Sequence, residues 1–151
     1  MKLKRSFSSY LLIMLVFFQM ISALPAGWSL VIKPSGTGIG IPLDLLQHTP
    51  FPDYMIPGLF LFFFLGLLPA LIFYGLVKRP IFNALEKFNL YKDYHWSWTF
   101  SFYLGLILIL WINMQLYFIR EFSILHFVYS MLGILIILIA HLPSTKRDFK
   151  K

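Results

Sequence analysis

The sequence predicts an all-α membrane fold, in which the whole chain, residues 1–151, forms one bundle of four transmembrane helices. Hydrophobic residues make up 59% of the chain and the mean hydropathy is +0.77, whereas soluble domains are about 45–50% apolar. Charged residues account for only 13%. Four stretches reach the ~20 apolar residues that a membrane-spanning helix needs. The predicted spans are residues 8–32, 54–77, 97–119 and 122–142.

The first span follows the basic residues Lys2, Lys4 and Arg5. Basic residues before an apolar run are also typical of a secretory signal peptide. The small residues that would offer a weak cleavage site are Ser22, Ala23 and Ala26. The apolar character continues past this site, through residues 28–32, so we favour an uncleaved helix. A removed signal peptide is the alternative.

The segment between the first two spans, residues 33–53, is rich in proline and glycine and reads KPSGTGIGIPLDLLQHTPFPD. Its alternating glycines do not form the dinucleotide-binding fingerprint, and no strand precedes them. Apolar residues continue along the segment, so we expect this loop to pack on the outer rim of the bundle. Asp53 is placed to cap the second span.

The link between the second and third spans begins with Lys78-Arg79-Pro80, which ends the second span. Four apolar residues then recur at the spacing of one helix face, namely Ile81, Phe82, Leu85 and Phe88. This pattern predicts a short cytoplasmic helix in the membrane interface. The simplest role for this helix is to join two spans.

The third and fourth spans are joined only by Arg120 and Glu121, so they must be antiparallel neighbours. Counting outward from this apex places Gln115 near the level of His126, and Asn113 near Tyr129 and Ser130. Polar side chains within the membrane usually face the bundle and bond across helices. We therefore predict a contact between Gln115 and His126, direct or through water.

Basic residues are distributed very unevenly between the two ends of the predicted bundle. One end has only Lys33 and Arg120. The eleven at the other end are Lys2, Lys4, Arg5, Lys78, Arg79, Lys87, Lys92, Lys146, Arg147, Lys150 and Lys151. Short basic segments stay on the cytoplasmic side of a membrane. The sequence thus predicts a multi-pass protein of the cell (inner) membrane with both termini in the cytoplasm.

Composition excludes or disfavours several functional classes. The absence of cysteine excludes disulfides, thiolate metal sites and dithiol redox chemistry. No span has a charge near its middle, which disfavours ion-coupled transport. The net charge of +7 is spread in short groups that fit contact with anionic lipids and the bilayer, not with nucleic acid. The four histidines are His48, His95, His126 and His141. Haem ligation is the weaker interpretation of them. We expect them to lie in the membrane interface and to bond neighbouring groups, and we expect no cofactor and no metal.

Several blocks of the sequence resemble a known pattern. PSGTGIGIPLDLL and TPFPDYMIPGLFLF lie in the outer loop and second span, and HWSW, LGLILILWINMQ and LPS follow. Together they resemble a family of small four-helix bacterial integral membrane proteins. The resemblance implies the four-helix architecture and carries over no catalytic residue.

Two functions fit these observations. The first is a non-enzymatic accessory or interaction component, which contacts itself or a membrane protein partner through helix faces. Small-residue pairs suited to close helix approach are Ser101 with Gly105 and Gly66 with Ala70. The alternative is an outward-facing small-molecule or lipid-binding site, or a membrane-embedded enzyme, under the 33–53 loop. The polar residues predicted near that loop are Asp44, His48, Asp53, Asn113, Gln115, Arg120, Glu121 and His126.

Overall fold

The computed structural model describes residues 4–151, and this part of the chain is helical with no β-strand. Lys2 of the predicted basic flank lies outside the described residues. Four helices are long and apolar enough to cross a membrane, which confirms the predicted all-helical class. They are α1 (Phe7–Ile32), the second span made of α2 (Met55–Phe62), a π-helical segment η2 (Phe63–Leu67) and α3 (Leu68–Lys78), then α5 (Trp96–Ile119) and α6 (Ile124–His141).

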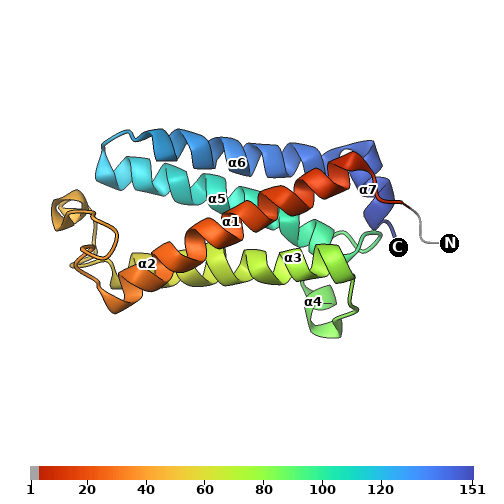
Figure 1. Cartoon of the computed structure of the whole chain (residues 1–151), viewed down its shortest axis with the longest axis horizontal. Coiled ribbons are helices and arrows are strands. Elements are labelled where there is room, and N and C mark those ends of the chain that lie inside the picture. Colours follow the sequence, from red (N-terminus) through yellow and green to blue (C-terminus); the bar gives the residue numbers. More distant parts are fainter. Residues whose placement is uncertain (1–3) are drawn as a thin grey trace.

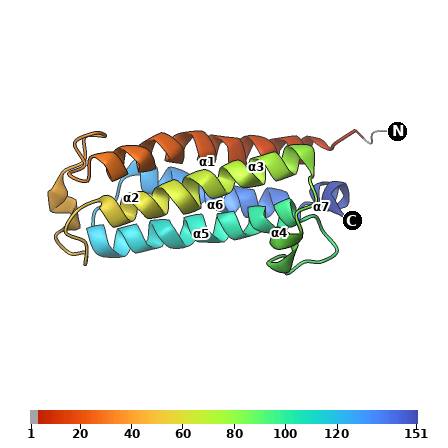
Figure 2. The same ribbon diagram turned by 90° about the horizontal axis from the view of Figure 1, so that it is seen from below.

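The spans run side by side as two antiparallel pairs, α1 with α2–α3 and α5 with α6 (Figures 1 and 2). The first described residues and the C-terminus lie at one end of the bundle, which we name the termini end. The 33–53 loop and the α5–α6 apex lie at the other end, the loop end. The loop contains one turn of 3-10 helix, η1 (Leu43–Leu46).

Glycine allows the helices of each pair to approach closely. A Cβ atom on Gly105 of α5 would lie 2.5 Å from Cγ1 of Ile137 and 2.9 Å from the carbonyl oxygen of Gly133, both on α6. On the other pair, a Cβ on Gly66 would lie 2.9 Å from Cδ2 of Leu24. These predicted small-residue positions therefore pack inside the bundle, where they are not available for contact with a second protein.

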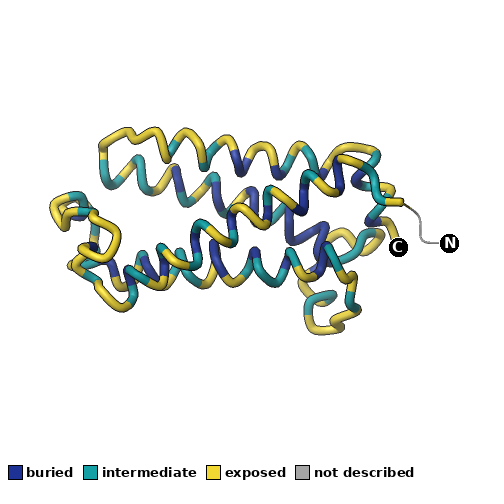
Figure 3. The backbone as a smooth tube through the Cα atoms, viewed as in Figure 1, coloured by how far each residue is buried: buried dark blue, intermediate teal, exposed yellow. Residues whose placement is uncertain are grey.

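The core at the termini end includes two tryptophan side chains. Trp96 and Trp98 are fully buried there, and their indole N–H groups donate to the carbonyl oxygens of Pro80 (2.9 Å) and Ala140 (2.7 Å). Figure 3 shows buried residues along the inward faces of the helices and mostly exposed residues on the loop and along the outer face of α6. Large apolar side chains project outward on all four spans, as a lipid-facing surface requires. Examples are Met14, Phe63, Leu110 and Leu138.

Two short helices complete the termini end. α4 (Asn83–Lys87) occupies the predicted interfacial segment and is shorter than the spacing suggested, while Ile81 and Phe88 on either side are strongly exposed. The sequence predicted only a basic tail after the fourth span, but residues there form α7 (Pro143–Phe149). Its last residue, Phe149, is 1% exposed.

Side-chain hydrogen bonds hold α7 against the start of α1. The Asp148 carboxylate accepts from the backbone N–H of Ser6 (2.6 Å), from the Ser6 hydroxyl (2.6 Å) and from the Ser9 hydroxyl (2.8 Å). The backbone N–H of His95 donates to the carbonyl oxygen of Phe149 at 2.9 Å. The end of the chain thereby contacts both the first span and the segment that leads into the third.

Candidate functional site

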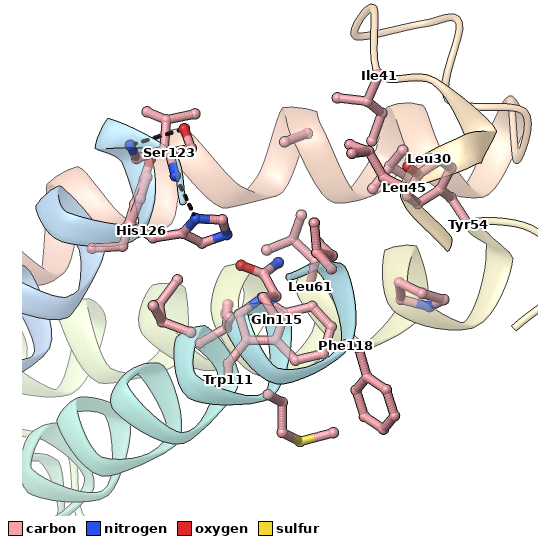
Figure 4. Close-up of a pocket in the computed structure, with 18 of the residues that line it drawn as sticks. Leu30, Ile41, Leu45, Tyr54, Leu61, Trp111, Gln115, Phe118, Ser123 and His126 are labelled. Atoms are coloured by element: carbon pink, nitrogen blue, oxygen red, sulfur yellow. Dashed lines mark hydrogen bonds between the residues drawn. The ribbon is translucent and has the colours of Figure 1, made fainter. Parts of the chain in front are cut away.

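A cavity of about 420 Å³ lies at the loop end, between the α1–α2 side of the bundle and the α5–α6 side (Figure 4). Side chains from all of these helices and from the 33–53 loop line it. Its volume falls within the ~300–1,000 Å³ of small-molecule sites. The loop contributes Ile39, Ile41, Leu45, Leu46, Thr49 and Phe51. The loop thus packs on the bundle, as predicted, and covers part of the cavity.

The cavity exists because the two helix pairs meet closely only toward the termini end. There, α3 packs against α5 so tightly that a Cβ on Gly75 would lie 2.3 Å from the Trp96 ring. Nearer the loop end the contact is made by large rings, because Phe60 of α2 stacks on Trp111 of α5 with 4.5 Å between ring centroids. Two stacked aromatic side chains hold the helices apart and leave space beside them.

The cavity is closed toward the middle of the bundle and open toward the loop end. Lining residues at its inner limit are almost fully buried, such as Gln19, Leu65 and Leu108 at 1% exposure each. Lining residues at the α5–α6 apex remain exposed, such as Phe122 at 71% and Leu125 at 60%. A molecule that entered from the loop end would therefore reach a floor near mid-bundle.

Gln19 of α1 is the polar residue at this floor. Its Nε2 donates to the carbonyl oxygen of Leu65 at 3.1 Å. In a regular helix that carbonyl would accept from residue 69, but Pro69 has no N–H. The freed carbonyl lies in the π-helical segment η2, and such segments are frequent at functional sites. Gln19 therefore supplies the hydrogen bond that Pro69 removes.

The oxygen of the Gln19 amide has no partner among the described residues. Its Oε1 is buried and accepts no hydrogen bond from residues 4–151. Buried polar atoms are nearly always bonded, and each exception needs an explanation. Gln19 is absent from the cluster that the sequence predicts, although it is the one amide side chain in the first span. Polar residues within a span mark functional sites even when they are uncharged.

Gln115 and His126 line the same cavity from α5 and α6, and Figure 4 shows both side chains directed into it. We predicted a contact between them, direct or through water, and no direct hydrogen bond joins them within the described chain. Instead, Nδ1 of His126 accepts from the backbone N–H of Ser123 at 3.0 Å, as part of a capping box that begins α6. A neutral imidazole that accepts at Nδ1 carries its proton on Nε2. The ring therefore has an N–H donor left for another partner.

The structure separates the predicted polar cluster into two groups. Gln115, Glu121 and His126 line the cavity, whereas Asp44, His48, Asp53, Asn113 and Arg120 do not. Asn113 is exposed and its Nδ2 donates to the carbonyl oxygen of Ile109, one turn back on the same helix. Asp53 accepts from the backbone N–H of Met55, the first residue of α2, at 2.9 Å, but the N-cap residue is Tyr54, one position later than predicted.

The cavity wall is mostly apolar. Within the described chain, Glu121 is the only lining residue with a formal charge. Polar groups of the loop are bonded locally: the Tyr54 hydroxyl donates to the carbonyl oxygen of Pro42 at 2.6 Å, and the Thr49 hydroxyl donates to that of Leu46 at 2.8 Å. The wall therefore offers few hydrogen-bonding groups, chiefly on Gln19, Gln115 and His126.

No group of three metal-ligating side chains occurs among residues 4–151. Three of the four histidines bond to neighbouring protein groups. His95 bonds the carbonyl oxygen of Pro80, His141 bonds that of Ile137, and His126 bonds the N–H of Ser123. The fourth, His48, lies exposed on the loop.

These features define a four-helix bundle with membrane-length spans and an apolar cavity under the loop at one end. No family model, curated protein or solved structure matches this chain. The resemblance to small four-helix bacterial membrane proteins consequently stays a prediction.

Proposed function

We propose that this chain is a non-enzymatic, multi-pass protein of the cell membrane that binds a neutral lipid, or a lipid-like amphiphile, in the cavity under the 33–53 loop. The observation that carries the proposal is the cavity itself: about 420 Å³, apolar, closed at mid-bundle and open at the loop end. In this proposal both termini lie in the cytoplasm and the cavity opens toward the outer leaflet.

The distribution of charge supports this orientation. The described basic residues gather at the termini end and in the link between the second and third spans, while the loop end has only Lys33 and Arg120. Because basic segments are retained on the cytoplasmic side, the termini end faces the cytoplasm. The cavity then lies in the half of the membrane that is farther from the cytoplasm.

The nature of the wall supports a neutral ligand. Moving a charged group from water into an apolar cavity without a paired charge is strongly unfavourable. Among residues 4–151 no Lys or Arg lines this cavity, and its one charged lining residue, Glu121, is exposed. Near its mouth, Nε2 of His126 offers a donor and Gln115 offers an amide. An apolar chain would fill the body of the cavity, and a hydroxyl, ester or amide group would bond at these side chains.

The accessory role through helix contacts has less support. The small residues that would mediate such contacts, Gly105 and Gly66, pack against Gly133 and Leu24 within the bundle. An enzymatic role has less support still, because five of the eight predicted polar residues lie outside the cavity. Binding is therefore the function that the geometry favours.

Lipid retention tests the proposal. The chain is purified in a mild detergent, and co-purified neutral lipid is measured by native mass spectrometry. Ala26→Phe places a ring in the cavity that Ala26 lines, and Met14→Phe adds a ring on the exposed face of the same helix. We expect wild type and Met14→Phe to retain one neutral lipid per chain and Ala26→Phe to lose it. Equal retention by all three proteins would rule out binding in this cavity.

A further inference from the structure

A second recess, of about 440 Å³, lies at the termini end and is distinct from the cavity under the loop. Its chemistry is different because its charged side chains are mostly basic. The residues that matter here are Arg79, Glu86, His95, Phe149, Lys150 and Lys151. They come from the end of α3, from α4, from the start of α5 and from the end of the chain after α7.

Arg79 is held in a defined position but its donors are unused. It ends α3 in the left-handed conformation, with φ of 52°. Its guanidinium carbon lies 4.7 Å from the centre of the Phe149 ring, which is itself buried. Among residues 4–151 the guanidinium has no hydrogen bond and no ion pair. A planar guanidinium stacked on an aromatic ring keeps its N–H groups free to bind an anion.

The nearby acids are already committed to other partners. The Glu86 carboxylate accepts from Nζ of Lys151 at 2.7 Å and from Nδ2 of Asn89 at 3.1 Å. Asp148, outside the recess, accepts from Ser6 and Ser9. Neither carboxylate bonds Arg79 or Lys150. Three of the lining side chains carry a positive charge and one carries a negative charge, so the recess has an excess of positive charge.

The remaining residues position this charge. The backbone N–H of Lys151 donates to the carbonyl oxygen of Asp93 at 2.9 Å, and that of His95 donates to Phe149 at 2.9 Å, so the last residues lie against the link. Nδ1 of His95 accepts from the N–H of Ser97, and its Nε2 bonds the carbonyl oxygen of Pro80. Both ring nitrogens of His95 are thus occupied by protein groups, which leaves Arg79 and Lys150 as the residues able to receive an anion.

We propose that this recess binds a phosphate group, with the Arg79 guanidinium as a two-pronged ligand and Lys150 as the second cation. The guanidinium fork matches two oxygens of a phosphate, and ammonium groups bind phosphate as point charges. The phosphate has two sources, the head group of an anionic phospholipid or free phosphate. Arg79 directly follows the last residue of the second span, where phospholipid phosphates lie, and basic pockets at such places bind lipid head groups.

Native mass spectrometry of the full chain in detergent tests the site, with phosphatidylglycerol, phosphatidylcholine and inorganic phosphate as separate probes. The variants are Arg79→Gln and Lys150→Gln. The matched control is Lys87→Gln, which removes an exposed charge on α4 outside the recess. Charge-assisted hydrogen bonds are strong enough that losing the two bonds from the Arg79 guanidinium to phosphate weakens phosphate binding at least about tenfold.

We expect wild type and Lys87→Gln to bind one phosphatidylglycerol in preference to phosphatidylcholine, with Arg79→Gln at least tenfold weaker and Lys150→Gln weaker to a smaller degree. Arg79→Lys should be intermediate, because it keeps the charge and loses the fork. Competition by inorganic phosphate would support the phosphate site and add free phosphate as a source. Equal binding by Arg79→Gln and Lys87→Gln, with both proteins folded by circular dichroism, would overturn the proposal. If Arg79→Gln does not fold, the same comparison is made with Lys150→Gln.

Discussion

Replacing Gln19 by methionine separates the structural role of this residue from its role in binding. Methionine has nearly the same length and no hydrogen-bonding groups. In wild type, Gln19 Oε1 is unpaired while the Leu65 carbonyl is bonded. In Gln19→Met the unpaired oxygen disappears, and the Leu65 carbonyl loses its side-chain donor. An unpaired buried polar group costs about 1–3 kcal/mol, so the two changes largely cancel.

The remaining cost is one hydrogen bond between helices. Such bonds average about 0.6 kcal/mol in membrane proteins. We therefore expect the lipid-free variant to unfold within about 1 kcal/mol of wild type, which is a change in Tm of about 2–4 °C for a chain of this size. Thermal unfolding in detergent, monitored by circular dichroism, measures this change.

Binding should change more than stability. Bound ligand stabilises a protein in proportion to the logarithm of its concentration over Kd. A hydrogen bond from the lipid to Oε1 is worth about 1 kcal/mol. Losing that bond in Gln19→Met raises the Kd for the lipid about fivefold, and the variant then gains less in Tm than wild type when neutral lipid is added. Gln47→Met, on the exposed part of the loop, is the control. A loss of several kcal/mol without lipid, or an undiminished gain with lipid, would refute this account of Gln19.

Three further predictions concern the bundle and its orientation. Gly105→Leu should destabilise the chain by about 1–3 kcal/mol in thermal unfolding, because its Cβ would lie 2.5 Å from Ile137 of α6. Gly40→Ala is the comparison: it has open space around it and only a positive φ to strain it, so it should cost about 1 kcal/mol. Burial favours a higher pKa for Asp148, but hydrogen bonds from the N-terminal serines and the nearby Arg147 outweigh it and hold the pKa below the ordinary value. This carboxylate consequently stabilises the fold at pH values above the ordinary carboxyl pKa, and its contribution is lost as pH falls through the depressed pKa. When Tm is measured against pH, the Tm of Asp148→Asn should therefore fall less over that acidic range than the Tm of wild type. The chain has no cysteine, so one introduced cysteine reports the position of its segment. Thr37→Cys should react with an impermeant maleimide on intact cells, and Asn83→Cys should react only after permeabilisation. The reverse pattern would contradict the proposed orientation.

The four spans could be predicted from the sequence because membrane helices are specified by length and apolar character alone. The hydrogen bonds that Asp53 and Ser123 accept at the starts of α2 and α6 also have local causes, although only that of Asp53 is predicted from the sequence. The rotation of a helix about its axis is harder to predict. Residues 113 and 115 differ by about 200° around a helix, so Asn113 and Gln115 cannot both face the cavity. Pairing by level from the apex fixes depth and leaves this rotation undetermined.

The features that were not predictable depend on contacts between distant residues. α7 is short and polar, and what holds it is the burial of Phe149 and the bonds of Asp148 with Ser6. Gln19 of α1 bonds the Leu65 carbonyl, which lacks its usual helical donor because Pro69 has no N–H. The reason for the role of Gln19 thus lies on another helix. The apolar residues of the loop did indicate that the loop packs on the bundle. The cavity beneath the loop, however, results from the separation of the two helix pairs, and this separation cannot be predicted from composition.

The contact between α7 and α1 has a consequence for how the protein is made. Ser6 and Asp148 are 142 residues apart, so Ser6 bonds a group that is synthesised long after it. Each antiparallel helix pair can insert as soon as its own residues emerge, since most of its contacts lie within the pair. The termini end can close only after α7 has been synthesised, because Asp148 bonds Ser6 and Ser9. Bundle assembly therefore has a step that waits for α7, and nascent chains that stall before Phe149 would present an open termini end.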